Sequence, residues 1–337
     1  MEVAVAFGQR EGFFAKRVAE LGIPVIDLGL RSGYDLWPRR LTSGALALAQ
    51  YEVVHAHGFN LPLGEVMRRA GRPIVFTEHG QFGLGRRLGL TGVIKLRVQR
   101  RFLVEHCAAI AANSDWTARR LSETYSIDPG RVTVVPNGIE PITAPALHRR
   151  AGNDRVLVVA FVGHLKRFKR VDRIIRALAR AQDHESVRIL IAGGGQLEDE
   201  LKALARKLGV EEQVDFLGWQ ADVVPVLAEA DVVVLPSEGE PFGLAMLEGS
   251  AQGLLPVAFS DGGGALECMP PDGRVVRDVD ELAALFSELK QSDALSPAAR
   301  EARSSWANEH FPIAKTAVRY LDLYRSSRPS PGRCLPG

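Results

Sequence analysis

The stretch ADVVVLPSEGEPFGLAMLEGSAQG, residues 230–253, passes from one apolar element into another. Its first seven residues are almost all apolar, which is typical of a strand buried on both faces. Its last ten have apolar residues at helical spacing. The loop between them holds Glu238 and Glu240, and Glu248 follows in the predicted helix. A strand that runs through a short loop into a helix is the unit of a parallel α/β sheet.

The same alternation runs along nearly the whole chain. Amphipathic helices, for example at 170–182 and 196–209, separate short apolar segments. We expect strands at 2–7, 23–28, 51–57, 73–79, 108–114, 131–138, 156–163, 187–194, 213–218, 230–236 and 254–260. This pattern predicts an α/β protein made of two Rossmann-like domains. Ligands of such sheets lie at the carboxyl ends of the strands, so we expect the active site in a cleft between the domains.

A Pro- and Ala-rich stretch at 140–155 interrupts the pattern and predicts a linker. We therefore place an N-terminal domain at 1–148 and a C-terminal domain at 149–310. A last helix at 311–327 is expected to pack back on the N-terminal domain, and the Pro- and Gly-rich tail at 328–337 is expected to be disordered.

Composition is typical of a globular protein, with 46% hydrophobic and 24% charged residues among 337. No apolar run reaches the ~18 residues that span a membrane, and the N-terminus lacks the features of a signal peptide. The three cysteines are far apart, which favours a reducing, cytoplasmic location. Residues 1–150 hold 20 basic against 13 acidic residues (+7), and the remainder 22 against 27 (−5). The basic half indicates an anionic partner, either a phosphate-bearing substrate or a membrane surface, or is a chance feature of the surface. We expect no nucleic-acid partner.

The loop and helix of the opening stretch suit an anionic ligand. We expect Phe242, Gly243 and Leu244 in the first helical turn, where free N–H groups attract an anion. Glu240 and Glu248 are eight residues apart, about 12 Å along a helix. One ligand as long as a sugar, a diphosphate and a ribose would span both, with Glu248 on the ribose hydroxyls and Glu240 on a sugar hydroxyl. Alternatively, Glu240 only complements the helix dipole, and Glu248 is solvated.

Two other motifs raise the question of a metal. Strands 51–57 and 73–79 carry His55, His57 and His79 near their ends, but no carboxylate or cysteine set accompanies them. Asp278 and Asp280 form a D-x-D motif, in which Asp280 is expected to cap the following helix. We therefore expect no metal.

Residues 240–257 resemble the E-x7-E region of retaining glycosyltransferases of the GT-B fold, family 4, which reads E-G-F-G-L-x-x-L-E-A-M-A-x-G-x-P-V. The resemblance extends, in the family's order, to RVTVVPNGIE, FVGHLKRFKRVDRIIRALA, LIAGGG, VDFLGW, EADVVVLPS and PVAFSDGGGALE. It implies a metal-independent hexosyltransferase without a cofactor, in which the domain at 1–148 binds the acceptor and the domain at 149–310 binds the nucleotide-sugar donor. Such an enzyme moves a sugar from a nucleotide diphosphate sugar to a sugar, lipid-linked or other hydroxyl acceptor, in polysaccharide, lipopolysaccharide or glycolipid assembly.

The resemblance also implies roles for single residues. Lys169 matches a lysine that binds the donor diphosphate, and His79 matches a histidine near the reacting carbon. At the position of a second phosphate-binding residue, the family's arginine is replaced by His164, which would make that contact depend on pH. The implied catalytic residues are Glu240, His79 and Lys169. The implied phosphate site is Gly163, His164, Lys169, Phe242, Gly243 and Leu244, with Glu248 on the ribose.

One departure from the family concerns the N-terminus. Family members begin with a strand and a Gly-Gly loop, and this chain is expected to start at the family's second strand. A non-catalytic, degenerate nucleotide-sugar-binding protein that lost its first strand therefore stays open as an alternative. A second alternative is a nucleotide-sugar epimerase of the same double-Rossmann shape.

The segment at 85–107 alternates basic and apolar residues. Such a helix lies on anionic bilayers, so we expect peripheral contact with the inner face of the plasma membrane. The alternative is an ordinary helix packed on the N-terminal sheet. The residues concerned are Arg86, Arg87, Lys95, Arg97, Arg100 and Arg101.

Overall fold

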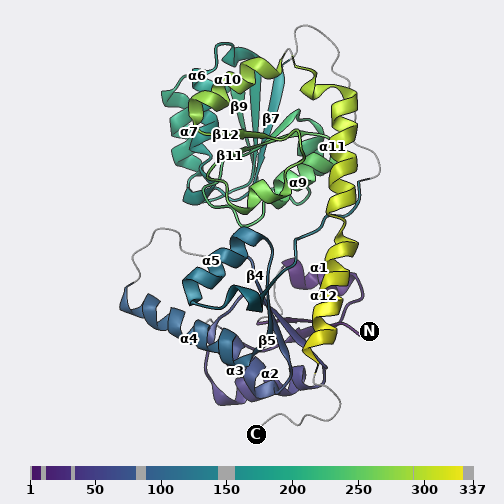
Figure 1. The fold of residues 1–337 in the computed structure, drawn as a ribbon. Coiled ribbons are helices and arrows are strands. Elements are labelled where there is room, and N and C mark those ends of the chain that lie inside the picture. The colour runs from purple at the N-terminus through teal and green to yellow at the C-terminus, as the bar shows by residue number, and fades with distance from the viewer. Residues whose placement is uncertain are drawn as a thin grey trace. The chain divides into compact units, whose positions relative to one another are not determined.

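The computed structural model describes residues 2–8, 13–31, 35–80, 89–142, 156–290 and 292–328, which form two compact units (Figure 1). The first unit comprises residues 1–113, 118–135 and 318–337, and the second comprises 114–117 and 136–317. Most of the expected linker and of the C-terminal tail lies outside the described residues. The free cysteines Cys107 and Cys268 are buried.

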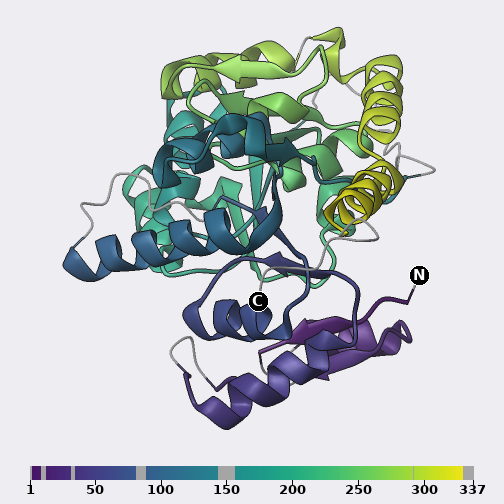
Figure 2. The ribbon, with the colours of Figure 1, turned by 60° about the horizontal axis from the view of Figure 1, so that its bottom comes forward.

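The first unit contains a four-stranded parallel sheet in chain order: β3 (Val54–His57), β4 (Ile74–Glu78), β5 (Cys107–Ala112) and β6 (Val132–Val134). Strands β1 (Val5–Phe7) and β2 (Val25–Asp27) form a separate parallel pair, drawn in purple in Figure 2. Each of these six strands lies within or overlaps a segment predicted to be a strand.

The helices of the first unit are α1 (Phe13–Glu20), α2 (Pro38–Ala49), α3 (Leu61–Ala70), α4 (Leu90–His106) and most of α5 (Asp115–Tyr125). Helix α3 shows why its boundaries fall where they do. The Asn60 side chain accepts a hydrogen bond from the Leu63 N–H at 2.9 Å, and Gly71 ends the helix at a φ of 63°. The core beneath these helices includes the fully buried Met67, Phe76, Leu103, Ile110 and Leu121.

The second unit contains a six-stranded parallel sheet in the order β12-β11-β10-β7-β8-β9. Because β7 lies beside both β8 and β10, the strand order reverses between β7 and β10. In open α/β sheets such a reversal point is where ligands bind. The strands are β7 (Leu157–Val162), β8 (Val187–Ala192), β9 (Val214–Gly218), β10 (Val232–Leu235), β11 (Leu255–Phe259) and β12 (Arg274–Val276). Only β12 has no predicted counterpart.

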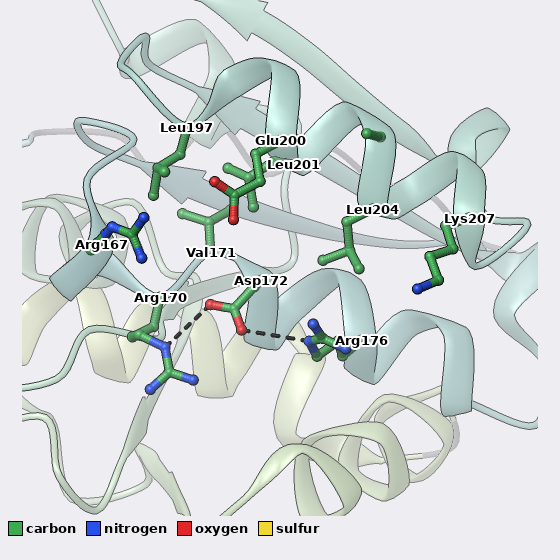
Figure 3. A pocket seen from close by; sticks show the side chains of 11 residues that line it. Arg167, Arg170, Val171, Asp172, Arg176, Leu197, Glu200, Leu201, Leu204 and Lys207 are labelled. Carbon is green, nitrogen blue, oxygen red and sulfur yellow. Dashed lines mark hydrogen bonds and ion pairs between the residues drawn. The ribbon is translucent and has the colours of Figure 1, made fainter.

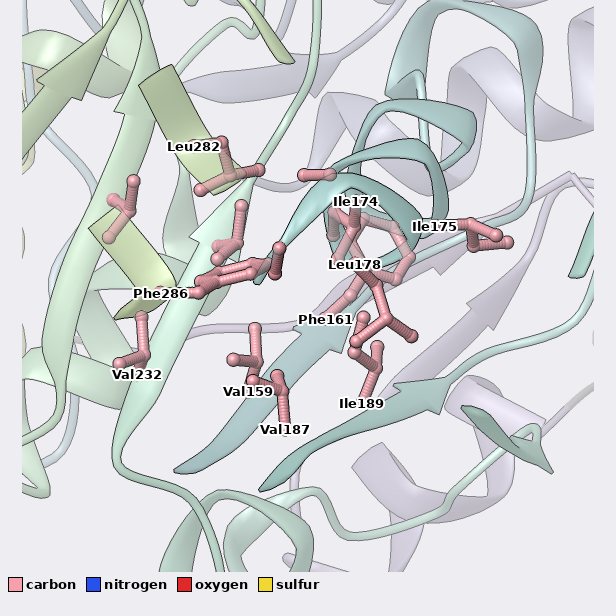
Figure 4. Close-up of a cluster of buried hydrophobic side chains, with 14 of the residues drawn as sticks. Val159, Phe161, Ile174, Ile175, Leu178, Val187, Ile189, Val232, Leu282 and Phe286 are labelled. Atoms are coloured by element: carbon pink, nitrogen blue, oxygen red, sulfur yellow. The ribbon is translucent and has the colours of Figure 1, made fainter. Parts of the chain in front are cut away.

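Helices cover both faces of this sheet (Figure 1). On one face, α6 (Asp172–Arg180), α7 (Glu198–Lys207) and α10 (Val279–Leu289) pack on Val159 and Phe161, as Figure 4 shows for part of this core. On the other face, α8 (Val224–Ala228), α9 (Leu244–Ala251) and α11 (Pro297–His310) share a core with Val158 and Ala160. The alternation along β7 follows from the two-residue period of a strand.

The prediction that Asp280 caps α10 is wrong. The cap is Asp278, whose carboxylate accepts hydrogen bonds from the N–H groups of Asp280 and Glu281, both at 2.9 Å. Asp280 lies in the first turn and pairs with Arg180 at 2.7 Å on the surface. Both aspartates of the D-x-D motif are thus engaged in structural contacts.

The last helix, α12 (Ile313–Ser327), joins the two units. The Tyr324 hydroxyl lies 2.7 Å from Nδ1 of His55 in β3, and the Tyr320 hydroxyl lies 3.2 Å from Oγ1 of Thr77 in β4. Within the described ranges, none of the helices has the length and apolar character needed to cross a membrane.

Candidate functional site

The loop between β10 and α9 is held in place by its own backbone. The Glu240 N–H donates to the Gly262 carbonyl at 3.0 Å, and the Gly264 N–H donates back to the Glu240 carbonyl at 2.7 Å. On its other side, the Glu238 N–H donates to the Phe168 carbonyl at 2.8 Å. The loop after β11 and the loop after β7 therefore fix this segment at the reversal point of the sheet.

The structure brings together Lys169 and Glu240, two residues predicted to belong to the site. Lys169 ends a 3₁₀ turn at Arg167–Lys169, and its Nζ donates to Glu240 Oε2 at 2.7 Å. The two side chains are only 15% and 11% exposed. A charge-assisted hydrogen bond with so little solvent around it is strong and holds both groups in one geometry.

Two glycines let the loops after β7 and β8 approach each other. A Cβ on Gly193 would lie 1.9 Å from the Gly163 carbonyl oxygen, so a larger residue has no room there. A Cβ on Gly163 would lie 3.8 Å from Lys169 Nζ. That distance is an ordinary contact, so it is the φ of Gly163, 153°, that favours glycine at this position. His164 follows Gly163 and is exposed.

Helix α9 begins at Leu244, later than predicted. Gly243 is its N-cap, with a φ of 88°, and Phe242 is buried before it. The expectation that residues 242–244 form the first turn therefore holds only for Leu244. The predicted rise between Glu240 and Glu248 along a helix is also wrong, because Glu240 lies in the loop and pairs as a parallel bridge with Gly263.

Glu248 lies in α9 and is half-buried. Its carboxylate makes no hydrogen bond or ion pair with any other described residue, and burial raises its pKa. Removing a carboxylate from water without a partner is unfavourable. A ligand hydroxyl that donates to Glu248 would offset this cost.

Arg173 and Asp261 support the loop and were not anticipated from the sequence. Arg173 donates to both carboxylate oxygens of Asp261, at 2.8 and 2.6 Å, and to the Pro236 carbonyl at 3.1 Å. Its guanidinium also lies 4.5 Å from the ring centre of Phe259. The pair ties α6 to the ends of β10 and β11. No local pattern marks it, since its members are 88 residues apart.

The three histidines at the ends of β3 and β4, His55, His57 and His79, lie close together. His79 follows β4, and its Nε2 lies 2.9 Å from Nδ1 of His57. Burial lowers the pKa of His79. Burial, together with His57 and His79, lowers the pKa of His55 to about 3, so its ring is neutral at physiological pH. The described residues contain no group of three or more His, Cys, Asp or Glu side chains arranged to hold a metal ion.

The segment predicted to contact a membrane lies partly outside the described residues, which omit 81–88. In α4, Phe102 and Leu103 are buried in the core of the first unit, whereas Ile94 is 52% exposed. Lys95 and Arg97 are also exposed. The C-terminal half of this helix thus packs as an ordinary core helix.

Known proteins resemble this chain in sequence and in fold. Residues 147–310 match the family described as glycosyl transferases group 1, and residues 1–142 match glycosyltransferase family 4. The D-inositol 3-phosphate glycosyltransferase of Mycolicibacterium smegmatis is 31% identical over 315 residues, covering 83% of this chain and 70% of that protein. The chain belongs to glycosyltransferase family 4.

Two further comparisons concern the length and the fold of this member of the family. The D-inositol 3-phosphate glycosyltransferase of Mycobacterium sp. (strain KMS) is 34% identical over 232 residues, which are 63% of this chain and 52% of that protein. The chain thus spans about half the length of that relative. The crystal structure of Anabaena HepE in complex with UDP and glucose superposes with a TM-score of 0.78 at 20% identity, over 94% of this chain and 90% of HepE. The GT-B fold, with its two Rossmann-like domains, is confirmed.

Proposed function

We propose that this family 4 glycosyltransferase transfers a sugar from a nucleotide diphosphate sugar to a hydroxyl acceptor, with retention of the anomeric configuration. The observation that carries the proposal is the 2.7 Å contact between Lys169 and Glu240 at the reversal point of the sheet. A diphosphate that enters there finds a shielded ammonium group and the first turn of α9. Both stabilise the negative charge that develops on the leaving diphosphate.

In this mechanism, Lys169 exchanges part of its contact with Glu240 for a phosphate oxygen. Glu240 then accepts a hydrogen bond from a hydroxyl of the donor sugar, and Glu248 accepts hydrogen bonds from the ribose. The bond between the anomeric carbon and the phosphate oxygen breaks while the acceptor oxygen bonds to the same face of that carbon. The departing phosphate oxygen takes the acceptor's proton. His79, a residue of the first unit, is proposed to contact the donor sugar in its neutral form.

The relatives suggest which substrates to test first. Crystal structures of HepE hold UDP, or UDP-glucose, and the curated relatives are named for D-inositol 3-phosphate. We propose a UDP-sugar as donor and a polyol phosphate, sugar or lipid-linked hydroxyl compound as acceptor. Products of this kind enter polysaccharide and glycolipid assembly. We propose that the reaction needs neither a metal nor an organic cofactor, because Lys169 and the start of α9 supply the positive charge.

A thermal-shift screen against UDP-, GDP-, ADP- and TDP-sugars tests the donor. A ligand at about 100 times its Kd stabilises the folded chain by about 2.7 kcal/mol. The donor that does so is then incubated with and without inositol phosphate and sugar acceptors. Sugar transfer that needs the acceptor supports the proposal. A donor sugar that changes without any acceptor identifies an epimerase, and tight binding without turnover on any acceptor identifies a binding protein. Either result overturns the proposal.

A further inference from the structure

A groove lies between the 3₁₀ turn at Arg167–Lys169 and helices α6 and α7 of the second unit, with a volume of about 490 Å³ (Figure 3). This volume lies in the range of small-molecule sites. Lys169 and Glu240 are not part of its lining. The groove is therefore separate from the site of the proposed sugar transfer, although the same three-residue turn contributes to both.

The floor of the groove is apolar, and its rim is positively charged. Leu197, Leu201 and Leu204 lie between the charged residues in Figure 3, together with Val171. The cations on the rim are Arg167, Arg170, Arg176 and Lys207. Against these four positive charges stand the carboxylates of Asp172 and Glu200, which leaves a net charge of +2.

Two of the four cations have no counter-ion. Asp172 accepts from Arg170 at 3.2 Å and lies 3.5 Å from Arg176, and these contacts are the dashed lines of Figure 3. Among the residues that the structure describes, the Arg167 and Lys207 side chains make neither a hydrogen bond nor an ion pair. Arg167 is contributed by the turn and Lys207 by the end of α7, and Figure 3 shows them at opposite ends of the groove, with the apolar side chains between them.

Arg170 has a strained backbone. Its φ is 48°, a left-handed value that, among the described residues other than glycine, only Ser126 shares. A residue with a Cβ is held there only when its surroundings enforce it, and such strain gathers at ligand-binding sites. Here Asp172 holds the guanidinium from one side, and Glu238 lies 3.6 Å away on another. The chain thus has an arginine on the rim at a position where a glycine would adopt the backbone conformation without strain.

We propose that this groove binds a phosphate ester of an apolar alcohol. The phosphate would lie at the end of the rim formed by the turn, where the Arg167 side chain offers unpaired donors and Arg170 lies beside it in Figure 3. Guanidinium groups bind phosphate through two parallel hydrogen bonds. The hydrocarbon part would cover the leucines of the floor, which contribute affinity in proportion to the apolar area removed from water. The phosphate would not bind favourably to the apolar floor, and the hydrocarbon part would not bind favourably to the charged rim.

Calorimetric titration of the whole chain with octyl phosphate, inorganic phosphate and octanol tests the proposal. Octyl phosphate is expected to bind at least about tenfold more tightly than either of the others, because only it uses both parts of the groove. Saturating UDP should leave this binding unchanged. Equal affinity for octanol and octyl phosphate, or displacement of octyl phosphate by UDP, would overturn the proposal.

Single variants locate the site. Arg167→Ala is expected to lower octyl phosphate affinity about tenfold, the loss of one charge-assisted hydrogen bond, whereas Lys207→Ala, at the other end of the groove, should change it much less. The matched control is Arg206→Ala, which removes the same charge from an exposed position on α7 outside the groove. Arg170→Gly should weaken binding while raising the midpoint of thermal unfolding, because the strain is relieved. Equal losses in Arg206→Ala and Arg167→Ala would reduce the effect to general surface charge and refute the assignment.

Discussion

Lys169→Ala removes the only cation that contacts the Glu240 carboxylate among the described residues, and leaves that carboxylate nearly buried. Breaking a fully buried ion pair from one side costs about 3–5 kcal/mol. Because the two side chains are still 15% and 11% exposed, we expect a smaller loss of about 2–3 kcal/mol. Urea denaturation followed by circular dichroism measures this loss as a lower unfolding midpoint.

The same substitution tests the chemistry. If Lys169 stabilises the leaving diphosphate, the rate of sugar transfer should fall by about 10²-fold or more, as when one preorganised donor is lost. Lys166→Ala is the matched control, because Lys166 lies in the same loop, carries the same charge and is exposed. We expect Lys166→Ala to keep nearly the parent's stability and rate.

A double variant separates the ion pair from other effects. In Lys169→Ala/Glu240→Ala no buried charge is left without its partner, so the double variant should lose less stability than the sum of the single variants. A coupling of about 1–3 kcal/mol is expected for groups in direct contact. Strictly additive losses, or a Lys169→Ala variant as stable and active as Lys166→Ala, would refute the reasoning.

Four further predictions concern other residues of the chain. Glu248→Ala should weaken nucleotide binding about tenfold in calorimetry without lowering the melting temperature, since Glu248 has no partner within the described chain; unchanged affinity would remove it from the site. His55 has a pKa of about 3 when folded, whereas the unfolded state takes up a proton near pH ~6.5. Stability should therefore be full above that pH and fall below it by up to about 1.4 kcal/mol per pH unit, and His55→Asn should show a flatter dependence on pH in urea denaturation. Sugar transfer should persist in EDTA, because Asp278 caps α10 and Asp280 pairs with Arg180; activity lost in EDTA and restored by Mn²⁺ would contradict this. The basic face of α4 should bind anionic vesicles, so the protein should float with them in a density gradient. Equal recovery with neutral vesicles would contradict membrane contact through these charges.

The strands could be predicted because parallel strands covered on both faces leave long apolar runs in the sequence. All eleven predicted segments contain a strand. Strand β12 escaped notice because it has three residues, of which Arg274 and Val275 are exposed. The cap of α10 was misassigned because either aspartate suits a cap. The start of the helix at Val279 decides for Asp278.

The site was predictable only where its residues follow a local pattern. Glu240 and Glu248 lie in one recurring motif, but the direct contact of Glu240 with Lys169 joins residues 71 positions apart. The Arg173–Asp261 pair and the left-handed backbone of Arg170 leave no trace in the surrounding sequence, since each depends on how separate loops meet. The late start of α9 likewise follows from the left-handed backbone of its N-cap Gly243, at a φ of 88°, which helical periodicity does not reveal.

The strand order of the second unit also decides when its strands can pair during synthesis of the chain. Strand β7 is made first but ends in the interior of the sheet, between β8 and β10. At about 5–20 residues per second, the 71 residues from Lys169 to Glu240 take roughly 4–14 s to synthesise. During that interval one edge of β7 is uncovered and the lysine has no carboxylate to meet. Chaperones that shield unpaired strand edges should therefore bind nascent chains most strongly between the appearance of β7 and that of β10.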